Sequence, residues 1–310
     1  MGRVRLSLLI GLLLAASGDS SVGSDSLTCL PAWNTVDSTA GVRLTPDALA
    51  LDPLDRLWIL DRARGRVMRF QVGEGSVGSF PVTTEGGDLP LASDLGASGS
   101  FLYVLEATTP RVILLDLDGH YREHVDLADA ALNGWRSGFL ASRILVDRSG
   151  DLWLVESASG GLLRLDRRGR FLDAPLELLP GQQRPARIAD AALGPGDELV
   201  ILDPSRRRIM VLGPDGVLQA EHALADAPRE PAALAVDRRG NLYLIEATGR
   251  VRIISSGGKL LWDGVAPGDP ATRPQRACVI GDSILCRTDT VLGTIRRWRI
   301  GRTETGDGSE

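Results

Sequence analysis

A pattern of two apolar strands separated by a tight turn recurs along the chain. In each clear copy a first strand ends at aspartate, a turn with glycine or proline follows, and a second strand runs to an acidic residue. The clear copies are residues 49–61, 144–156 and 234–246. Degenerate copies end at Glu106 and Asp203, and a sixth ends at Arg287. The ends are therefore 45, 50, 47, 43 and 41 residues apart, which is typical of a four-stranded blade.

The remainder of each repeat predicts two more strands. A third strand starts shortly after the acidic residue, often at an arginine such as Arg66, Arg111 or Arg208, and a fourth follows a glycine-containing turn. The first two strands are nearly continuous in apolar residues, as strands buried on both faces should be, whereas the fourth alternates like an outer edge. Because one such sheet cannot bury both faces alone, we expect six to stack in a ring.

The two ends of the repeat array predict how this ring closes. The sixth blade supplies only three strands, between residues 274 and 300, before a polar tail at 301–310. Residues 33–36 lie before the first blade, and pairing them beside residues 294–300 would complete the sixth sheet and cover its edge. The sequence thus predicts an all-β, six-bladed β-propeller over residues 31–300, preceded by a polar linker at 18–30 and followed by a disordered tail.

The repeat also resembles a known family. The pattern Asp61-x4-Arg66-Val67-x2-Phe70, preceded by A-L-A-L-D and L-W-I-L, resembles the NHL repeat of six-bladed β-propellers, over about residues 33–300. Blades one, four and five match best, whereas blade three has Gly161 where arginine is expected and blade six has Arg287 in place of the acid. The resemblance implies the fold but little about activity, because such propellers include protein-binding platforms, lyases and hydrolases.

The N-terminus has the features of a signal peptide. Arg3 and Arg5 precede an apolar run at 6–16, too short to span a membrane, and Ala15 and Ser17 suit cleavage after residue 17. No other stretch approaches a membrane span. We therefore expect residues 1–17 to be removed and the protein to be secreted or periplasmic. Cys29 is separated from the apolar run by polar residues, which disfavours lipidation.

Composition and charge narrow the partners. The chain is 43% hydrophobic and 24% charged, as a globular protein should be, and its net charge is −5. A negative protein is a poor partner for nucleic acid or an anionic membrane. We expect a monomeric propeller whose partner is a protein or a glycan.

The acidic residues that end the second strands are the most regular polar feature. They should ring the face that carries the connections between blades, which we call the loop face. We interpret them as structural: each accepts hydrogen bonds from its own loop and pairs with the arginine of the next strand. A metal site would need several to converge, and a ring holds them apart. These repeat carboxylates are Asp61, Glu106, Glu156, Asp203 and Glu246.

Five charged residues near the starts of the first strands are candidates for ligand binding. They are Asp94, Arg143, Arg187, Asp190 and Arg276. The arginines could clamp an anion where the central channel opens on the loop face, or they could pair with the aspartates. Three guanidinium groups against two carboxylates should repel a divalent cation. We therefore predict no metal there.

The usual catalytic residues do not converge. Of the three histidines, His120 and His124 lie on an outer strand of blade two and His222 lies on one of blade four, too far apart for one Zn²⁺ ion. No G-x-S-x-G motif occurs. The resemblance implies that the lyases and amidating enzymes of such propellers depend on histidine, often with metal. We assign no catalytic residue and no cofactor.

Three cysteines leave one unpaired if a disulfide forms. Cys278 and Cys286 flank a turn at residues 281–283, and a three-residue loop would place them directly opposite each other, whereas a two-residue loop would not. A disulfide between them is expected in an exported protein. Cys29 would then be free or bonded to another chain.

The hypothesis from the sequence is an exported, non-catalytic propeller that binds a partner through its loop face. The alternative is a metal-assisted lyase or lactone hydrolase with its site at the mouth of the channel. A metal, or three converging polar side chains at that mouth, would favour the enzyme.

Overall fold

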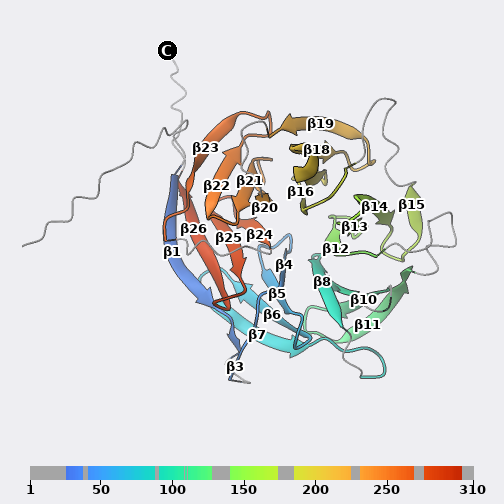
Figure 1. Cartoon of the computed structure of the whole chain (residues 1–310). Helices are drawn as coiled ribbons and strands as arrows, with labels where there is room; N and C mark the ends of the chain where they lie inside the picture. The colour runs from blue at the N-terminus through green and yellow to red at the C-terminus, as the bar shows by residue number, and fades with distance from the viewer. Residues whose placement is uncertain are drawn as a thin grey trace, which may run out of the picture.

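The computed structural model is a β-propeller, and the prediction of the fold class is confirmed (Figure 1). It describes residues 26–37, 41–87, 91–107, 109, 111–127, 140–173, 185–224, 231–268 and 276–301. The expected signal peptide and nearly all of the expected polar tail lie outside these ranges. Within them, no helix is long and apolar enough to cross a membrane.

The described residues form six four-stranded antiparallel sheets, one per blade. From the centre outward, blade one is β4 (Ala48–Leu51), β5 (Leu57–Asp61), β6 (Arg66–Gln71) and β7 (Gly75–Pro81). Blade two is β8 (Ala92–Ala97), β9 (Phe101–Glu106), β10 (Arg111–Asp116) and β11 (Tyr121–Asp126). Blade three is β12 (Arg143–Val146), β13 (Leu152–Glu156), β14 (Gly161–Leu165) and β15 (Phe171–Asp173).

Blades four to six continue the ring. Blade four is β16 (Asp190–Leu193), β17 (Leu199–Asp203), β18 (Arg208–Leu212) and β19 (Leu218–Ala223), with a 3₁₀ turn at Pro204–Arg206. Blade five is β20 (Pro231–Val236), β21 (Leu242–Glu246), β22 (Arg250–Ile254) and β23 (Leu260–Val265). Blade six is β24 (Ala277–Ile280), β25 (Ile284–Asp289), β26 (Thr294–Gly301) and, outermost, β1 (Ser26–Asn34). A small hairpin pairs β2 (Val36–Asp37) with β3 (Val42–Arg43).

Burial follows the predicted pattern of apolar residues. Every residue of β5, β17 and β21 is buried, because second strands are covered on both faces by neighbouring blades. The outer strand β19 alternates between half-buried and exposed residues. Among the described residues the hydrophobic core accordingly divides into six clusters, each shared by two neighbouring blades. The ring is therefore held by the contacts between its blades.

The predicted closure by an N-terminal strand is confirmed, and the strand differs in extent. β1 pairs antiparallel with β26 from Ser26 opposite Gly301 to Asn34 opposite Thr294, at the left edge of the ring in Figure 1. It thus includes residues 26–30, which the sequence suggested as linker, and it ends before Val36, which belongs to β2. The register shifts between Leu30 and Trp33, around Pro31. Because this irregularity interrupts the strand pattern, the full extent of β1 could not be predicted from the sequence.

Stacked side chains reinforce the closure. The ring of Trp33 stacks on Phe70 of blade one at 5.6 Å between centroids, and the Arg297 guanidinium of β26 lies 4.0 Å from the Trp33 centroid. Leu27 is buried in the core between blades five and six. One short strand therefore joins the last blade to both of its neighbours.

Candidate functional site

The second strand of every described blade ends at a carboxylate on the loop face. Blade six was misread in the sequence, because Asp289, not Arg287, pairs opposite the start of the third strand as Asp61 does in blade one. Arg287 lies two residues earlier on β25 and is fully buried, with its guanidinium 5.7 Å from the ring centroid of Trp298. The repeat therefore ends in an acid six times.

These carboxylates fasten the loops around them. Asp61 accepts hydrogen bonds from the backbone N–H of Thr45 at 2.9 Å and of Arg64 at 2.9 Å. Asp203 does the same with Ala186 at 3.3 Å and Arg206 at 3.2 Å. Such a carboxylate ties the connection entering its blade to the turn leaving its second strand. These contacts are what a structural role for the repeat carboxylates requires.

The pairing with arginine is less regular. Glu106 pairs with Arg111 as the repeat suggests, and Asp203 pairs with Arg208 at 3.4 Å between Oδ2 and Nε. In blade one, Arg64 takes this place at 2.8 Å. In blade five, Nε of Arg250 lies 4.0 Å from the carboxylate of Glu246, and burial raises the pKa of that carboxyl group.

Six equivalent positions form a second ring, at the end of the central channel nearest the loop face, which we call the channel ring. Each pairs opposite the residue that precedes the repeat acid, as Asp94 pairs with Leu105 and Arg143 with Val155. In blade order the positions are Ala48, Asp94, Arg143, Asp190, Ala233 and Arg276. The ring therefore contains two aspartates, two arginines and two alanines, and its formal charges balance.

Arg187 does not belong to the channel ring. It lies three residues before Asp190, is exposed, and makes no hydrogen bond or ion pair with another described residue. The expected excess of three guanidinium groups over two carboxylates is therefore wrong for the channel ring, which has two of each. Sequence spacing alone could not separate these two positions of blade four.

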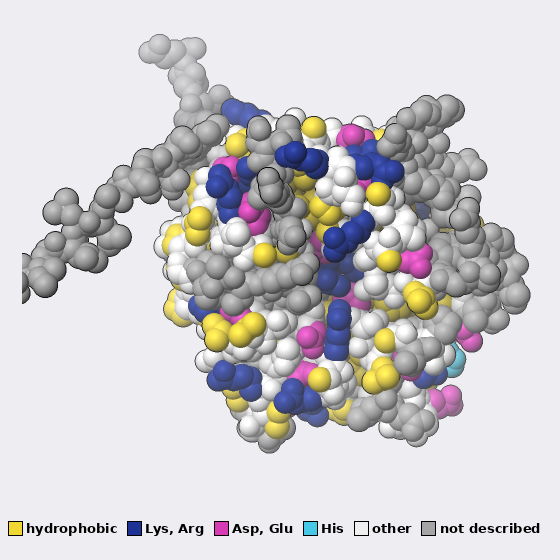
Figure 2. All heavy atoms as spheres, in the orientation of Figure 1, with side chains coloured by type: hydrophobic (Ala, Val, Ile, Leu, Met, Phe, Trp, Pro, Cys, Tyr) yellow, Lys and Arg dark blue, Asp and Glu magenta, His cyan; other side chains and the backbone are white. Residues whose placement is uncertain are grey.

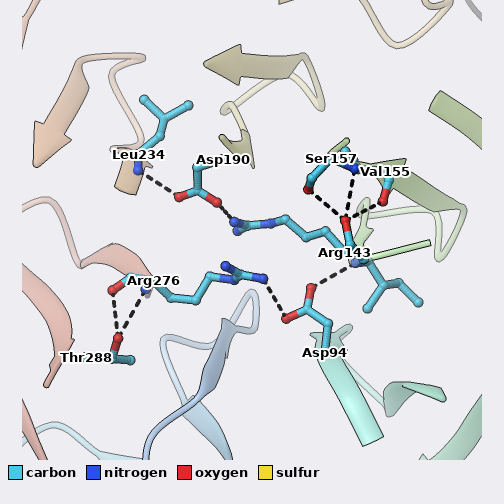
Figure 3. Close-up of polar contacts among 10 residues, drawn as sticks. Asp94, Arg143, Val155, Ser157, Asp190, Leu234, Arg276 and Thr288 are labelled. Atoms are coloured by element: carbon cyan, nitrogen blue, oxygen red, sulfur yellow. Dashed lines mark hydrogen bonds and ion pairs between the residues drawn. The ribbon is translucent and has the colours of Figure 1, made fainter. Parts of the chain in front are cut away.

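The charged side chains of the channel ring bind one another (Figure 3). Arg143 forms an ion pair with Asp190, and Nη2 of Arg276 lies 3.4 Å from Oδ1 of Asp94. The two guanidinium groups reach toward the centre from opposite sides of the ring. Figure 2 shows basic and acidic side chains together at the centre of this face.

Each aspartate also accepts a backbone N–H group from the inner edge of the next blade. Oδ2 of Asp94 accepts the N–H of Ile144 at 2.9 Å, and Oδ2 of Asp190 accepts the N–H of Leu234 at 2.8 Å. The first strands are bonded on one side only, so their inner N–H groups need such acceptors. The aspartates therefore clamp blade two to blade three and blade four to blade five.

The channel ring does not fit a divalent cation. Both aspartates are buried, and each is already bound by a guanidinium group and a backbone N–H. Burial lowers the pKa of Arg143, as does the positive charge of Arg276, whereas Asp94 raises it. Arginine nevertheless remains a cation in proteins. Among the described residues, no group of three histidine, cysteine or acidic side chains lies close enough to hold a metal.

The central channel continues from Arg143 toward the opposite face, where turns join first and second strands and which we call the turn face. Its volume is about 630 Å³, and its walls are mainly aliphatic residues of the six first strands. Aspartates that cap the turns, including Asp52, Asp147 and Asp237, lie at its far end. They accept turn N–H groups, as Asp52 does from Leu54 at 2.9 Å. The repeat pattern places these aspartates at the ends of first strands but does not indicate that they line the channel.

The cysteines lie as the register suggests. The loop between β24 and β25 has three residues, and Cys278 is directly opposite Cys286. Both are buried as free thiols, and Cys29 is exposed on β1. A hydrogen bond with Cys286, burial and the charge of Cys286 raise the pKa of the Cys278 thiol.

Comparison with known proteins shows the class of fold, a β-propeller, but does not assign the chain to a family. No protein-family model matches the chain, and no curated protein sequence matches it. The resemblance to NHL repeats therefore stays a prediction, whereas the six-bladed β-propeller is shown.

Solved structures share the fold. A streptogramin B lyase superposes with a TM-score of 0.60 at 12% identity, over 89% of this chain and 98% of its own. A virginiamycin B lyase from Staphylococcus aureus gives 0.59 at 16% identity, over 90% and 89%. A Bacteroides thetaiotaomicron protein of unknown function gives 0.59 at 12%, over 90% and 76%. At such identities the likeness shows the fold alone.

Proposed function

We propose that this chain is an exported, non-catalytic propeller that binds a protein partner through its loop face. The observation that carries the proposal is a set of exposed aliphatic side chains there. Leu91 is 60% exposed, Leu140 69% and Val291 77%. Each adjoins a repeat acid: Leu91 and Leu140 precede first strands, and Val291 follows Asp289. Exposed apolar groups mark an interaction surface when they form a continuous patch, and a patch on the loop face is what the proposal requires.

The charged residues of the loop face support a binding role over catalysis. The aspartates of the channel ring are occupied by ion pairs and backbone N–H groups, so neither is free to act as a base. One similar virginiamycin B lyase is catalytically inactive when a histidine is replaced by alanine. Here His124 and His222 lie on the outer strands β11 and β19, and His120 precedes β11. All three therefore lie on or beside the outermost strands of their sheets, away from the first strands that line the channel.

The test compares two faces of the same protein. A variant with Leu91, Leu140 and Val291 each replaced by aspartate should lose capture of the partner from native extract. The matched control is Leu54→Asp, which changes a side chain that is 67% exposed on the turn face. Equal capture by both variants would refute a loop-face site. A captured glycan in place of a protein would change the class of partner and keep the surface.

Export is tested separately. The proposal expects the mature chain to begin at residue 18, and mass spectrometry of the protein recovered outside the cytoplasm measures this directly. Recovered protein that still begins at residue 1 would contradict the proposed cleavage.

A further inference from the structure

The central channel is a cavity that is charged at one end and aliphatic along its walls. Its volume of about 630 Å³ lies in the range of small-molecule sites. Its lining includes residues of the turn face but none of the repeat carboxylates, so the cavity opens on the turn face and ends at the channel ring. Leu49, Leu95, Leu193 and Val279 are among the aliphatic residues between these two ends.

Arg143 is the charged residue at the inner end of this cavity. Its side chain is only 8% exposed, and its Nη1 forms the ion pair with Asp190. Nε and Nη1 are buried atoms, whereas Nη2 is not one of them, and no hydrogen bond from Nη2 occurs among the described residues. Because Arg143 lines the cavity, Nη2 is a donor that a molecule in the channel can reach.

The aspartates of the channel ring leave this donor without an acceptor. Asp190 gives Oδ1 to Arg143 and Oδ2 to the N–H of Leu234. Asp94 divides its two oxygens in the same way, between Arg276 and the next blade. A guanidinium group has five N–H donors, and a carboxylate that accepts two of them is its strongest partner. Asp190 therefore satisfies only part of the Arg143 guanidinium group.

The electrostatics at this end favour an anion. Burial lowers the pKa of Arg143, the positive charge of Arg276 lowers it further, and Asp94 opposes both effects. The two guanidinium groups reach toward each other across the ring (Figure 3). Since arginine keeps its charge in proteins, a nearby negative charge would stabilise this arrangement. The ring is already neutral, so one added negative charge is better accommodated than two.

The walls select the remainder of the ligand. Aliphatic walls gain free energy by covering an apolar chain. The first strands β4, β12, β16 and β24 have four residues each, which corresponds to about 13 Å at about 3.3 Å per residue. An extended octanoate molecule is shorter than this. The channel therefore has room for a linear chain along its axis.

The acidic residues at the turn-face opening do not prevent this binding, because arginines balance their charges. The ion pairs there are Asp52 with Arg56 at 2.6 Å, Asp55 with Arg238 at 2.8 Å, Asp147 with Arg164 at 3.4 Å and Asp197 with Arg148 at 3.6 Å. The apolar end of the ligand lies nearest to this opening, and the negative end lies farthest from it.

We propose that the central channel binds a linear aliphatic monocarboxylate. Its carboxylate accepts a hydrogen bond from Nη2 of Arg143, and its chain lies along the aliphatic walls toward the turn face. This site is separate from the loop face and does not depend on the partner proposed above.

Three probes of matched length test the proposal: octanoate, octanamide and octylamine. Calorimetric titration of the full mature chain should show octanoate binding at least tenfold more tightly than octanamide, because a charged acceptor makes the stronger hydrogen bond to guanidinium. Octylamine should bind more weakly still, because its charge repels Arg143. Equal binding of octanoate and octanamide, preference for octylamine, or no saturable binding of octanoate at millimolar concentration would each overturn the proposal.

A double variant locates the site. Arg143→Met combined with Asp190→Asn leaves no uncompensated charge buried, so it should fold, and melting curves check this before titration. It should bind octanoate at least tenfold more weakly than the parent and no longer prefer it to octanamide. The control is Arg187→Met, which makes the same change at an exposed arginine outside the cavity and should bind normally. Unchanged octanoate binding by the double variant would overturn the proposal. The comparison of probes on the unaltered protein decides the matter even if the double variant misfolds.

Discussion

The ion pair between Arg143 and Asp190 offers a sharp test of what the channel ring does. Arg143→Met keeps the aliphatic length of the side chain and leaves the Asp190 carboxylate without its cation. Asp190→Asn leaves the arginine without its anion and keeps an oxygen to accept the N–H of Leu234, now at 2.8 Å. The double variant removes both charges.

The magnitudes follow from burial. The Arg143 and Asp190 side chains are 8% and 0% exposed. Breaking such a buried pair from one side costs about 3–5 kcal/mol, because an uncompensated charge stays buried, whereas replacing both partners is often close to neutral. We therefore expect each single variant to lose about 3–5 kcal/mol of unfolding free energy. The double variant should lose much less than either single variant, because it leaves no uncompensated charge buried.

Urea unfolding followed by fluorescence of the six tryptophans measures these differences. The equivalent cycle on Arg276 and Asp94 is the internal comparison. That arginine is 12% exposed and its ion pair with Asp94 is 3.4 Å long, so the coupling should be smaller. A coupling near zero for Arg143 and Asp190 would show that the pair does not hold the blades together, and the reasoning would fail.

Four further outcomes are expected. A chain starting at Gly41 should lose most of its stability in thermal melting because it lacks β1, whereas one starting at Ser26 should melt like the mature protein; equal melting would contradict the closure. Millimolar Ca²⁺, Mg²⁺ or Zn²⁺ should leave the melting temperature unchanged; a metal-dependent rise that disappears when either aspartate of the channel ring becomes asparagine would favour the enzyme. Burial raises the pKa of Glu246 above 4.5, so the stability linked to its protonated form is present below pH 4.5 and declines as pH rises through the folded pKa. Glu246→Gln should therefore gain on the parent protein as pH rises above 4.5, and a constant difference would count against this. Thiol titration of exported protein under denaturing conditions should find one free thiol, because Cys278 and Cys286 are opposite each other; three thiols would refute the disulfide.

The architecture could be predicted from the sequence because each strand of the repeat is indicated by a short local pattern of apolar and polar residues. Apolar runs that end in Asp61 or Glu246 predict strands buried on both faces, whichever blades cover them. The register of β24 and β25 follows from a three-residue loop. The predicted end of the second strand in blade six was wrong for a local reason as well. Arg287 interrupts an apolar run and so suggests the end of a strand, yet its guanidinium is buried over Trp298 and β25 continues to Asp289.

The candidate sites depended on contacts between blades, which no single repeat contains. Asp94 and Asp190 could be placed near the channel, but their partners Ile144 and Leu234 belong to the following blades. His222 was correctly placed on an outer strand. Its contact with Gly258 of the neighbouring blade could not be predicted from the sequence of one repeat.

The pairing of β1 with β26 sets the order in which the molecule can be completed. Ser26 is among the first described residues to be synthesised and Gly301 is the last, and they pair with each other. Contacts so distant along the chain form late and slow the folding of a protein. Until the last strand emerges, β1 has no partner, and afterwards β26 exposes its edge until β1 docks. Unpaired edges of this kind invite aggregation. The edge strand β1 therefore stays unpaired while the blades are made, and the ring can close only after β26 has emerged.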